Sequence, residues 1–196
     1  MFVQVIEGKL KDQDLLTRQL ERWRKEIKPG AKGYLGSTGG ATADGRSIAV
    51  VRFESEAAAR ANSERAEQGA WWNETSKAFD GEPNFTESSD TELLFDGGSN
   101  NAGFVQVMKG KVKDAAAFRK WGKEHEGNLK KIRPDLIGGL DIYQPDGSFT
   151  SVAYFTSEAE ARKNEKAMAE DPMMAEYMSH MAGEMEFLDI TDPDID

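Results

Sequence analysis

Apolar residues in this chain alternate between two spacings, one typical of strands and one typical of helices. Residues 2–7 and 104–109 are β-rich runs that each lead to a glycine. The stretches after them carry apolar side chains three and four residues apart, as a buried helical stripe does. These stripes are Leu16, Leu20, Trp23 and Ile27, and Phe118, Trp121, His125 and Leu129. Asp12 and Asp114 precede the stripes and are suitable N-caps for two helices.

A hairpin is predicted after each of these helices. Residues 34–40 and 48–53 are joined through Asp44-Gly45, and residues 139–143 and 150–155 through Asp146-Gly147. Ser55 and Ser157 then begin a second helix. This helix is interrupted, because Asp171-Pro172 has the form of a new N-cap followed by a proline, and Gly69-Ala70 has the same register in the first half. A last strand is predicted near Phe85 and Phe187.

One offset relates the two halves. Phe2-Val3-Gln4-Val5 recurs as Phe104-Val105-Gln106-Val107, 102 residues later, and Ser55-Glu56-Ala57 recurs as Ser157-Glu158-Ala159 at the same distance. Pro29 and Pro134 lie 105 residues apart, which predicts a second copy three residues longer near the first helix. The chain is therefore an internal duplication.

Each copy predicts a β-α-β-β-α-β, ferredoxin-like unit of the α+β class. We expect one unit at 1–95, a linker at 96–103, a second unit at 104–190 and an acidic tail at 191–196. Helices cover only one face of such a sheet. We therefore expect the two units to pack as an internal pseudo-dimer in one α/β barrel, the chain being a monomer or a weak homodimer.

Composition excludes several classes of partner and chemistry. A net charge of −10, with lysine and arginine scattered among the acids, argues against nucleic acid. The absence of cysteine excludes disulfides, thiolate nucleophiles and cysteine-ligated metals. No apolar run approaches the roughly 18–20 residues that span a bilayer, so no membrane partner is expected. The chain opens directly on a strand without a targeting segment, and we expect a cytoplasmic protein.

Several of these segments resemble one known superfamily. They are the Phe-Val-Gln-Val strands, the junctions Phe53-Glu54-Ser55-Glu56-Ala57 and Phe155-Thr156-Ser157-Glu158-Ala159, and the broken helix at Asp171-Pro172-Met173-Met174. Over nearly the whole chain, twice, it resembles the dimeric α/β-barrel superfamily and, within it, antibiotic-biosynthesis-monooxygenase-like domains. That superfamily includes oxygenases, haem-degrading enzymes, isomerases, dismutases and ligand sensors, so the resemblance specifies fold better than activity. It implies a ligand cleft between the helices and the sheet of one unit.

The glutamines of the opening strands are candidate ligand-binding residues. Gln4 and Gln106 each lie mid-strand among apolar residues, where a buried amide must bond to the protein or to a ligand. Haem-degrading relatives have asparagine on this strand, so glutamine departs from their pattern.

Trp71 and Trp72 could form an aromatic wall for a flat ligand, or could belong to the core. The equivalent positions in the second half are occupied by Met173 and Met174. Any ligand site is therefore expected to differ between the halves.

The chain has two histidines, His125 and His180, and either could act as a base, a proton shuttle or a haem ligand, or could be structural. Haem-degrading relatives pair tryptophan and histidine on the second helix of one unit. Here the tryptophans and His180 fall in different halves, which argues against haem chemistry.

Arg52 and Tyr154 occupy equivalent strand positions. Arg52 could hold an anionic substrate, although pairing with one of the 35 acidic residues is the alternative.

No catalytic motif emerges from these residues, and neither a metal nor a cofactor is expected. The first functional hypothesis is a protein that binds a small apolar or aromatic molecule, with cofactor-independent monooxygenase-like activity. The alternative is a non-catalytic ligand sensor or accessory module of the same fold.

Overall fold

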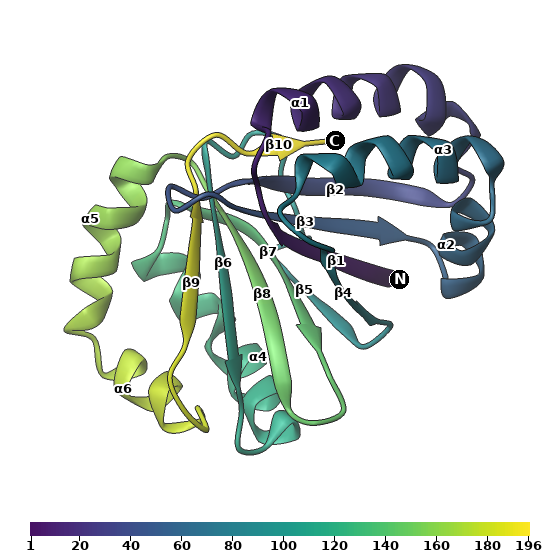
Figure 1. Cartoon of the computed structure of the whole chain (residues 1–196). Helices are drawn as coiled ribbons and strands as arrows, with labels where there is room; N and C mark the ends of the chain where they lie inside the picture. Colours follow the sequence, from purple (N-terminus) through teal and green to yellow (C-terminus); the bar gives the residue numbers. More distant parts are fainter. The chain divides into compact units, whose positions relative to one another are not determined.

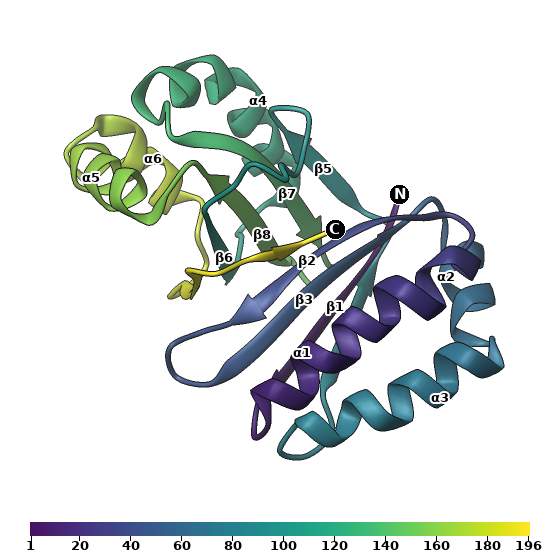
Figure 2. The same cartoon turned by 90° about the horizontal axis from the view of Figure 1, so that it is seen from above.

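The computed structural model describes residues 1–196 and separates them into two compact units. The first unit comprises Met1–Ser89 with Asp194–Asp196, and the second comprises Asp90–Pro193. Each contains a five-stranded antiparallel sheet whose helices lie on one face (Figures 1 and 2). The predicted α+β class with two ferredoxin-like units is confirmed.

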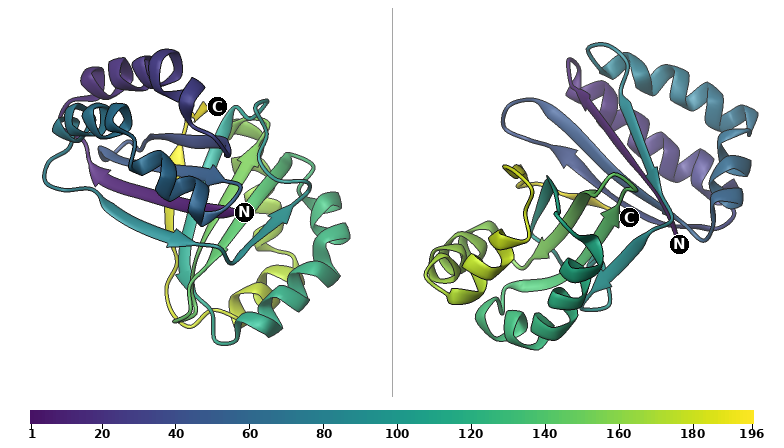
Figure 3. Two further views of the ribbon diagram at one scale, coloured as in Figure 1. Left: turned by 90° about the vertical axis from the view of Figure 1, so that its right-hand side faces the viewer. Right: turned by 90° about the horizontal axis from the view of Figure 1, so that it is seen from below.

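The first unit has the strand order β10-β2-β3-β1-β4. Its strands are β1 (Phe2–Lys9), β2 (Tyr34–Ala41), β3 (Arg46–Phe53), β4 (Asn84–Ser88) and β10 (Asp194–Ile195). Its helices are α1 (Gln13–Arg22), α2 (Glu56–Ser63) and α3 (Ala66–Thr75). A π-helical turn over Trp23–Ile27 extends α1, and α1 and α3 lie side by side (Figures 2 and 3).

The second unit has the order β5-β7-β8-β6-β9. Its strands are β5 (Thr91–Leu94), β6 (Phe104–Lys111), β7 (Leu136–Tyr143), β8 (Ser148–Phe155) and β9 (Glu186–Ile190). Its helices are α4 (Ala115–Ile132), α5 (Glu158–Ala169) and α6 (Pro172–Ser179). No helix of either unit combines the length and the hydropathy that crossing a membrane requires.

The predicted N-caps are present. The Asp12 carboxylate accepts a hydrogen bond from the Leu15 amide at 2.8 Å, and the Asp114 carboxylate accepts one from the Ala117 amide at 3.0 Å. Ser55 and Ser157 cap α2 and α5 in the same way. Each cap satisfies an amide that a helix N-terminus would otherwise leave unpaired.

The 102-residue offset holds through the first helix region as well. β2 begins at Tyr34 and β7 at Leu136, and each strand has an irregularity in register two residues later. The predicted three-residue insertion is wrong. The spacing of Pro29 and Pro134 does not measure an insertion, because the two prolines are not structurally equivalent. Pro29 lies in a 3₁₀ turn, whereas Pro134 follows the end of α4.

The second helix is broken in both units, at different places. Asp171 caps α6 through the Met173 amide at 2.8 Å, as predicted. In the first unit α3 already begins at Ala66, so Gly69 lies inside it. The earlier break is held by Arg65, whose guanidinium donates to Asn62 Oδ1 and to the Ile27 carbonyl oxygen.

The fifth strand of each sheet comes from the segment that follows the other repeat. Strand β5 pairs with β7, and β10 pairs with β2. Residues 90–95, which we assigned to the first unit, therefore belong to the second, and part of the predicted acidic tail is a strand of the first. These strands have four and two residues, too few for an alternating pattern to be visible.

Candidate functional site

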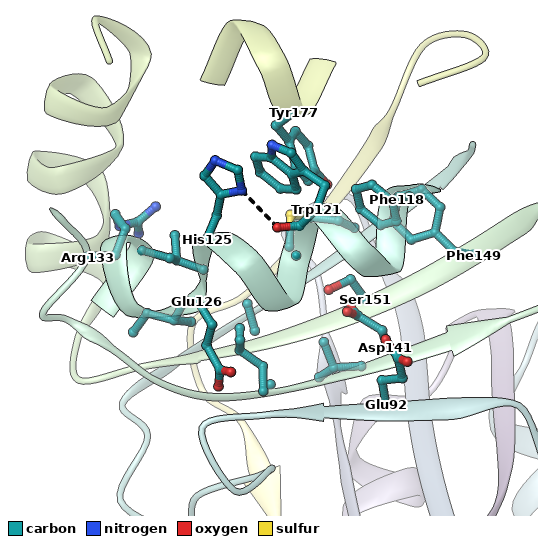
Figure 4. A pocket seen from close by; sticks show the side chains of 18 of the residues that line it. Glu92, Phe118, Trp121, His125, Glu126, Arg133, Asp141, Phe149, Ser151 and Tyr177 are labelled. Carbon is teal, nitrogen blue, oxygen red and sulfur yellow. Dashed lines mark hydrogen bonds between the residues drawn. The ribbon is translucent and has the colours of Figure 1, made fainter. Parts of the chain in front are cut away.

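A cavity of about 400 Å³ lies between the helices and the sheet of the second unit (Figure 4). Strands β5 to β8 and helices α4 to α6 supply most of its wall. The aromatic part of the lining comprises Phe118, Trp121, Tyr143, Phe149, Phe155, Tyr177 and Phe187. Six of the eight methionines in the chain complete it: Met108, Met168, Met173, Met174, Met178 and Met185. The lining is mainly apolar and adaptable in shape.

The aromatic side chains pack against one another along α4 and α6. Phe118 and Trp121 are nearly parallel, with ring centroids 6.2 Å apart, and Tyr177 approaches Trp121 at 5.7 Å. Burial raises the pKa of the Tyr143 and Tyr177 hydroxyls, so both remain protonated at neutral pH.

The polar floor of the cavity consists of three cross-strand neighbours. Asp141 on β7 stands opposite Glu92 on β5 and opposite Ser151 on β8, and all three residues line the cavity. Asp141 is half-buried and lines the cavity. Burial raises its pKa to about 6; the Ser151 hydroxyl bonds to the carboxylate and opposes this shift, while the negative charge of Glu92 adds to it.

The corresponding space in the first unit contains tryptophans. Trp23, at the position of His125, packs edge-on against Tyr34 at 4.8 Å and is tilted against Trp71 at 6.3 Å. Trp71 is buried, and its indole N–H donates to the Gln19 carbonyl oxygen at 2.8 Å. Trp72 packs against Trp71. Trp71 therefore lies in the packed interior of the first unit and Trp72 is half-buried beside it; neither lines the cavity of the second unit.

Gln4 and Gln106 take part in equivalent hydrogen-bond networks, one within each unit. The Gln4 amide donates to Glu87 at 2.7 Å, and Glu87 pairs with Arg60. Exactly 102 residues later in register, Gln106 donates to Asp189 at 2.9 Å, and Asp189 pairs with Arg162. Gln106 also lines the cavity of the second unit, and Gln4 does not. The repetition indicates that the amides connect the first and last strands of each unit to the second helix.

His125 lines the cavity and His180 does not. His125 Nδ1 lies 2.9 Å from the Trp121 carbonyl oxygen, its Nε2 lies 3.5 Å from Glu176 Oε2, and its ring stacks on Trp121 at 4.7 Å. His180 ends α6 and packs against Phe118 and Trp121.

These residues do not fit a haem held by histidine. Both ring nitrogens of His125 face protein partners, and His180 is absent from the lining. No group of three or more histidine, aspartate and glutamate side chains is placed to hold a metal ion.

Arg52 and Tyr154 lie on the sheet faces that do not carry helices. Strand alternation directs Tyr154 away from Ser151, Ala153 and Phe155, which line the cavity. Tyr154 is fully buried, and the Nε atom of Arg52 is buried without a hydrogen-bond partner. Neither residue contributes to the cavity.

Asp141, Ser151, Glu92 and Glu126 were missed by sequence reasoning. A signal for two of them exists in the repeat, because Asp141 and Ser151 replace Gly39 and Ala49 of the first copy. Polar side chains that appear on the helix-facing side of two neighbouring strands in one copy alone mark a position where the copies have diverged.

Comparison with known proteins extends this picture at the level of fold. No protein-family model matches the sequence, and no curated protein matches it. Solved structures do match over both units. A "putative monooxygenase" from Lactobacillus acidophilus NCFM matches with a TM-score of 0.73 at 11% identity, covering 99% of this chain and 98% of that one. The chain shares its fold.

Two further structures agree. A "putative monooxygenase" from Fusobacterium nucleatum subsp. nucleatum ATCC 25586 has a TM-score of 0.74 at 10% identity, covering 100% of this chain and 93% of that one. An anthrone oxidase-like protein has a TM-score of 0.64 at 8% identity, covering 99% and 92%. At identities this low, a structural match establishes the fold alone. The three matches confirm the fold resemblance expected from the sequence.

Proposed function

We propose that the second unit binds a small, mainly apolar aromatic molecule in the cavity between α4, α6 and the sheet. The observation that carries this proposal is the lining itself: seven aromatic side chains and six methionines surround about 400 Å³, and Asp141, Ser151 and Glu92 lie together on the floor. Ligand sites of proteins have this size and this composition. The first unit, whose tryptophans pack into the corresponding space, has a structural role.

The activity that we propose for this site is cofactor-independent oxygenation. The likeness in fold to proteins described as monooxygenases and as anthrone oxidase-like supports it. Anthrone is a suitable test substrate, because it reacts with dioxygen to give anthraquinone and water. Asp141 would accept the proton that anthrone loses as its enolate forms, since a carboxyl with a pKa of about 6 is an effective base near neutral pH.

Two glycines on α4 provide a matched test of binding. A Cβ at Gly122 or at Gly127 would meet no atom within 4 Å, so a side chain can begin at both positions without a clash. Gly122 lines the cavity and Gly127 does not. A native mass spectrum of protein purified from its source should show a retained small molecule, lost in Gly122→Leu and kept in Gly127→Leu. Retention in both variants would contradict the site.

Oxygen uptake separates the two functional hypotheses. With anthrone, we expect uptake by the native protein and by Gly127→Leu, and at least tenfold less by Asp141→Asn. A ligand bound in the cavity without any oxygen uptake would assign the protein to the alternative, a non-catalytic sensor or accessory module.

A further inference from the structure

We infer that the cavity selects aromatic molecules that carry a positive charge, with the charge placed against Asp141 and Glu126. The inference rests on the proposed function, because it names the class of ligand for the same cavity. It follows from the charges that line the wall and from the partners that each of them has.

The cationic side chains of the lining already have carboxylate partners. Arg119 lies 2.6 Å from Asp90, Lys123 lies 3.2 Å from Glu92, and Arg133 lies 2.8 Å from Asp135 in a buried pair. These cations have little charge left to attract an anionic ligand.

Two carboxylates of the lining have no cation within ion-pair distance. Asp141 bonds to the Ser151 hydroxyl, and Glu126 accepts only a long hydrogen bond of 3.4 Å from the Phe95 amide. Figure 4 shows the Glu126 side chain extending from α4 toward the strands that carry Asp141. The uncompensated charge that faces the cavity is therefore negative, and a cation would relieve it.

The aromatic wall favours the same class of ligand. A cation is attracted to the face of an aromatic ring, most strongly where water is excluded. One ring of the lining already interacts in this way, since the Arg119 guanidinium lies 4.0 Å from the centroid of Tyr143. The methionines adapt to the shape of the apolar part, so the positive charge is the main feature that the site specifies.

Binding of a cation should also be linked to release of a proton. The charged and titratable groups around Asp141 are Glu92, Arg119, Tyr143 and Tyr177, and the first two are held by Lys123 and Asp90. A cation beside Asp141 favours its ionised form. Protein at pH 6, where part of the Asp141 population is protonated, should therefore release protons when the cation binds.

The test uses three probes with one ring system: 1-naphthylmethylammonium, 1-naphthylmethanol and 1-naphthoate. Isothermal titration calorimetry with the full chain at pH 7.5 should give a dissociation constant for the ammonium at least tenfold lower than for the alcohol, and weaker binding still for naphthoate. Repeating the ammonium titration at pH 6 in buffers of different ionisation enthalpy should reveal proton release. Asp141→Asn should remove the preference and the proton release while leaving the alcohol within about twofold; Glu126→Gln should halve the preference or more.

Glu184→Gln is the matched control, because it removes one acidic charge at an exposed position of the same unit outside the lining. It should retain the full preference. Equal affinities for the ammonium and the alcohol in the native protein would overturn the inference and leave the proposed function standing. Absence of binding by all three probes would overturn both. A preference kept in Asp141→Asn and in Glu126→Gln would also overturn the assignment to these carboxylates.

Discussion

Asp141 is the cross-strand neighbour of Ser151 and forms a hydrogen bond with its hydroxyl. The equivalent pair in the first unit is Gly39 and Ala49, which stand opposite each other in the same register. At these positions the second unit therefore carries polar side chains where the first unit carries glycine and alanine. This difference distinguishes the sheet beneath the cavity from the equivalent sheet of the first unit.

The raised pKa of Asp141 predicts that this residue destabilises the fold at neutral pH. Its pKa is about 6 in the folded protein and 3.8 in the unfolded chain, so the folded state holds the proton more tightly. The contribution of Asp141 to stability is complete below pH 4 and is lost as the pH rises through 6. Asp141→Asn should therefore be more stable than the native protein at pH 8, by roughly 2–3 kcal/mol.

Chemical denaturation at pH 8 and at pH 4.5 checks this prediction. The advantage of the variant should shrink strongly at the lower pH, whereas Glu184→Gln should show no such dependence. An advantage of the same size at both values would show that the pKa of Asp141 is not raised.

The glutamine networks predict equal structural costs in the two units. Gln4→Ala and Gln106→Ala each leave a carboxylate–arginine pair without its amide donor, and each should lower the free energy of unfolding by about 1 kcal/mol. Ligand affinity measured with Gln106→Ala should stay within threefold of the native value. A tenfold loss of affinity would instead make Gln106 a ligand-binding residue, as the sequence first suggested.

The filled space of the first unit predicts that Trp71 is important for stability. Trp71→Ala removes a buried indole and its hydrogen bond to Gln19, and should cost about 3–5 kcal/mol in thermal or chemical unfolding. Met174→Ala, at the register of Trp72 and in the wall of the cavity, should cost less than about 2 kcal/mol. Similar losses in both variants would argue that the two units are equally packed.

A fragment of residues 1–97 should not behave as a monomer. It would carry β5 without its partner β7, and β2 without β10, so two strands would present unpaired backbone groups. The apolar sheet face inferred from the sequence adds to this tendency. Light scattering at micromolar concentration should detect dimers or aggregates, and a fragment ending at Ser89 tests the part due to β5. A well-folded monomer of residues 1–97 would contradict the prediction.

Local chemistry made much of the fold predictable. Capping aspartates and serines, the Asp-Gly turns and the alternation of Phe2 to Val5 each determine structure within a few residues. Because the two copies keep these signals in one register, errors such as the one over Pro29 and Pro134 affected a single loop.

The candidate site was less predictable because it depends on pairings across the sheet. Glu92 faces Asp141 only because β5 joins β7, and nothing in a four-residue strand indicates its partner. The sequence also suggests Trp71 and Trp72 as a ligand wall, yet Trp71 is buried in the first unit and Trp72 packs against it. A comparison of the two copies, position by position, would have pointed toward Asp141, because Gly39 occupies the equivalent position.

The placement of β10 has a consequence for how the chain folds as it leaves the ribosome. Strand β2 is complete at Ala41, but the strand that pairs with its outer edge is Asp194–Ile195. At typical elongation rates that edge waits roughly 8–30 s for its partner. The sheet that is translated first is therefore finished last, and a ribosome stalled before residue 194 would hold a nascent chain with an open strand edge.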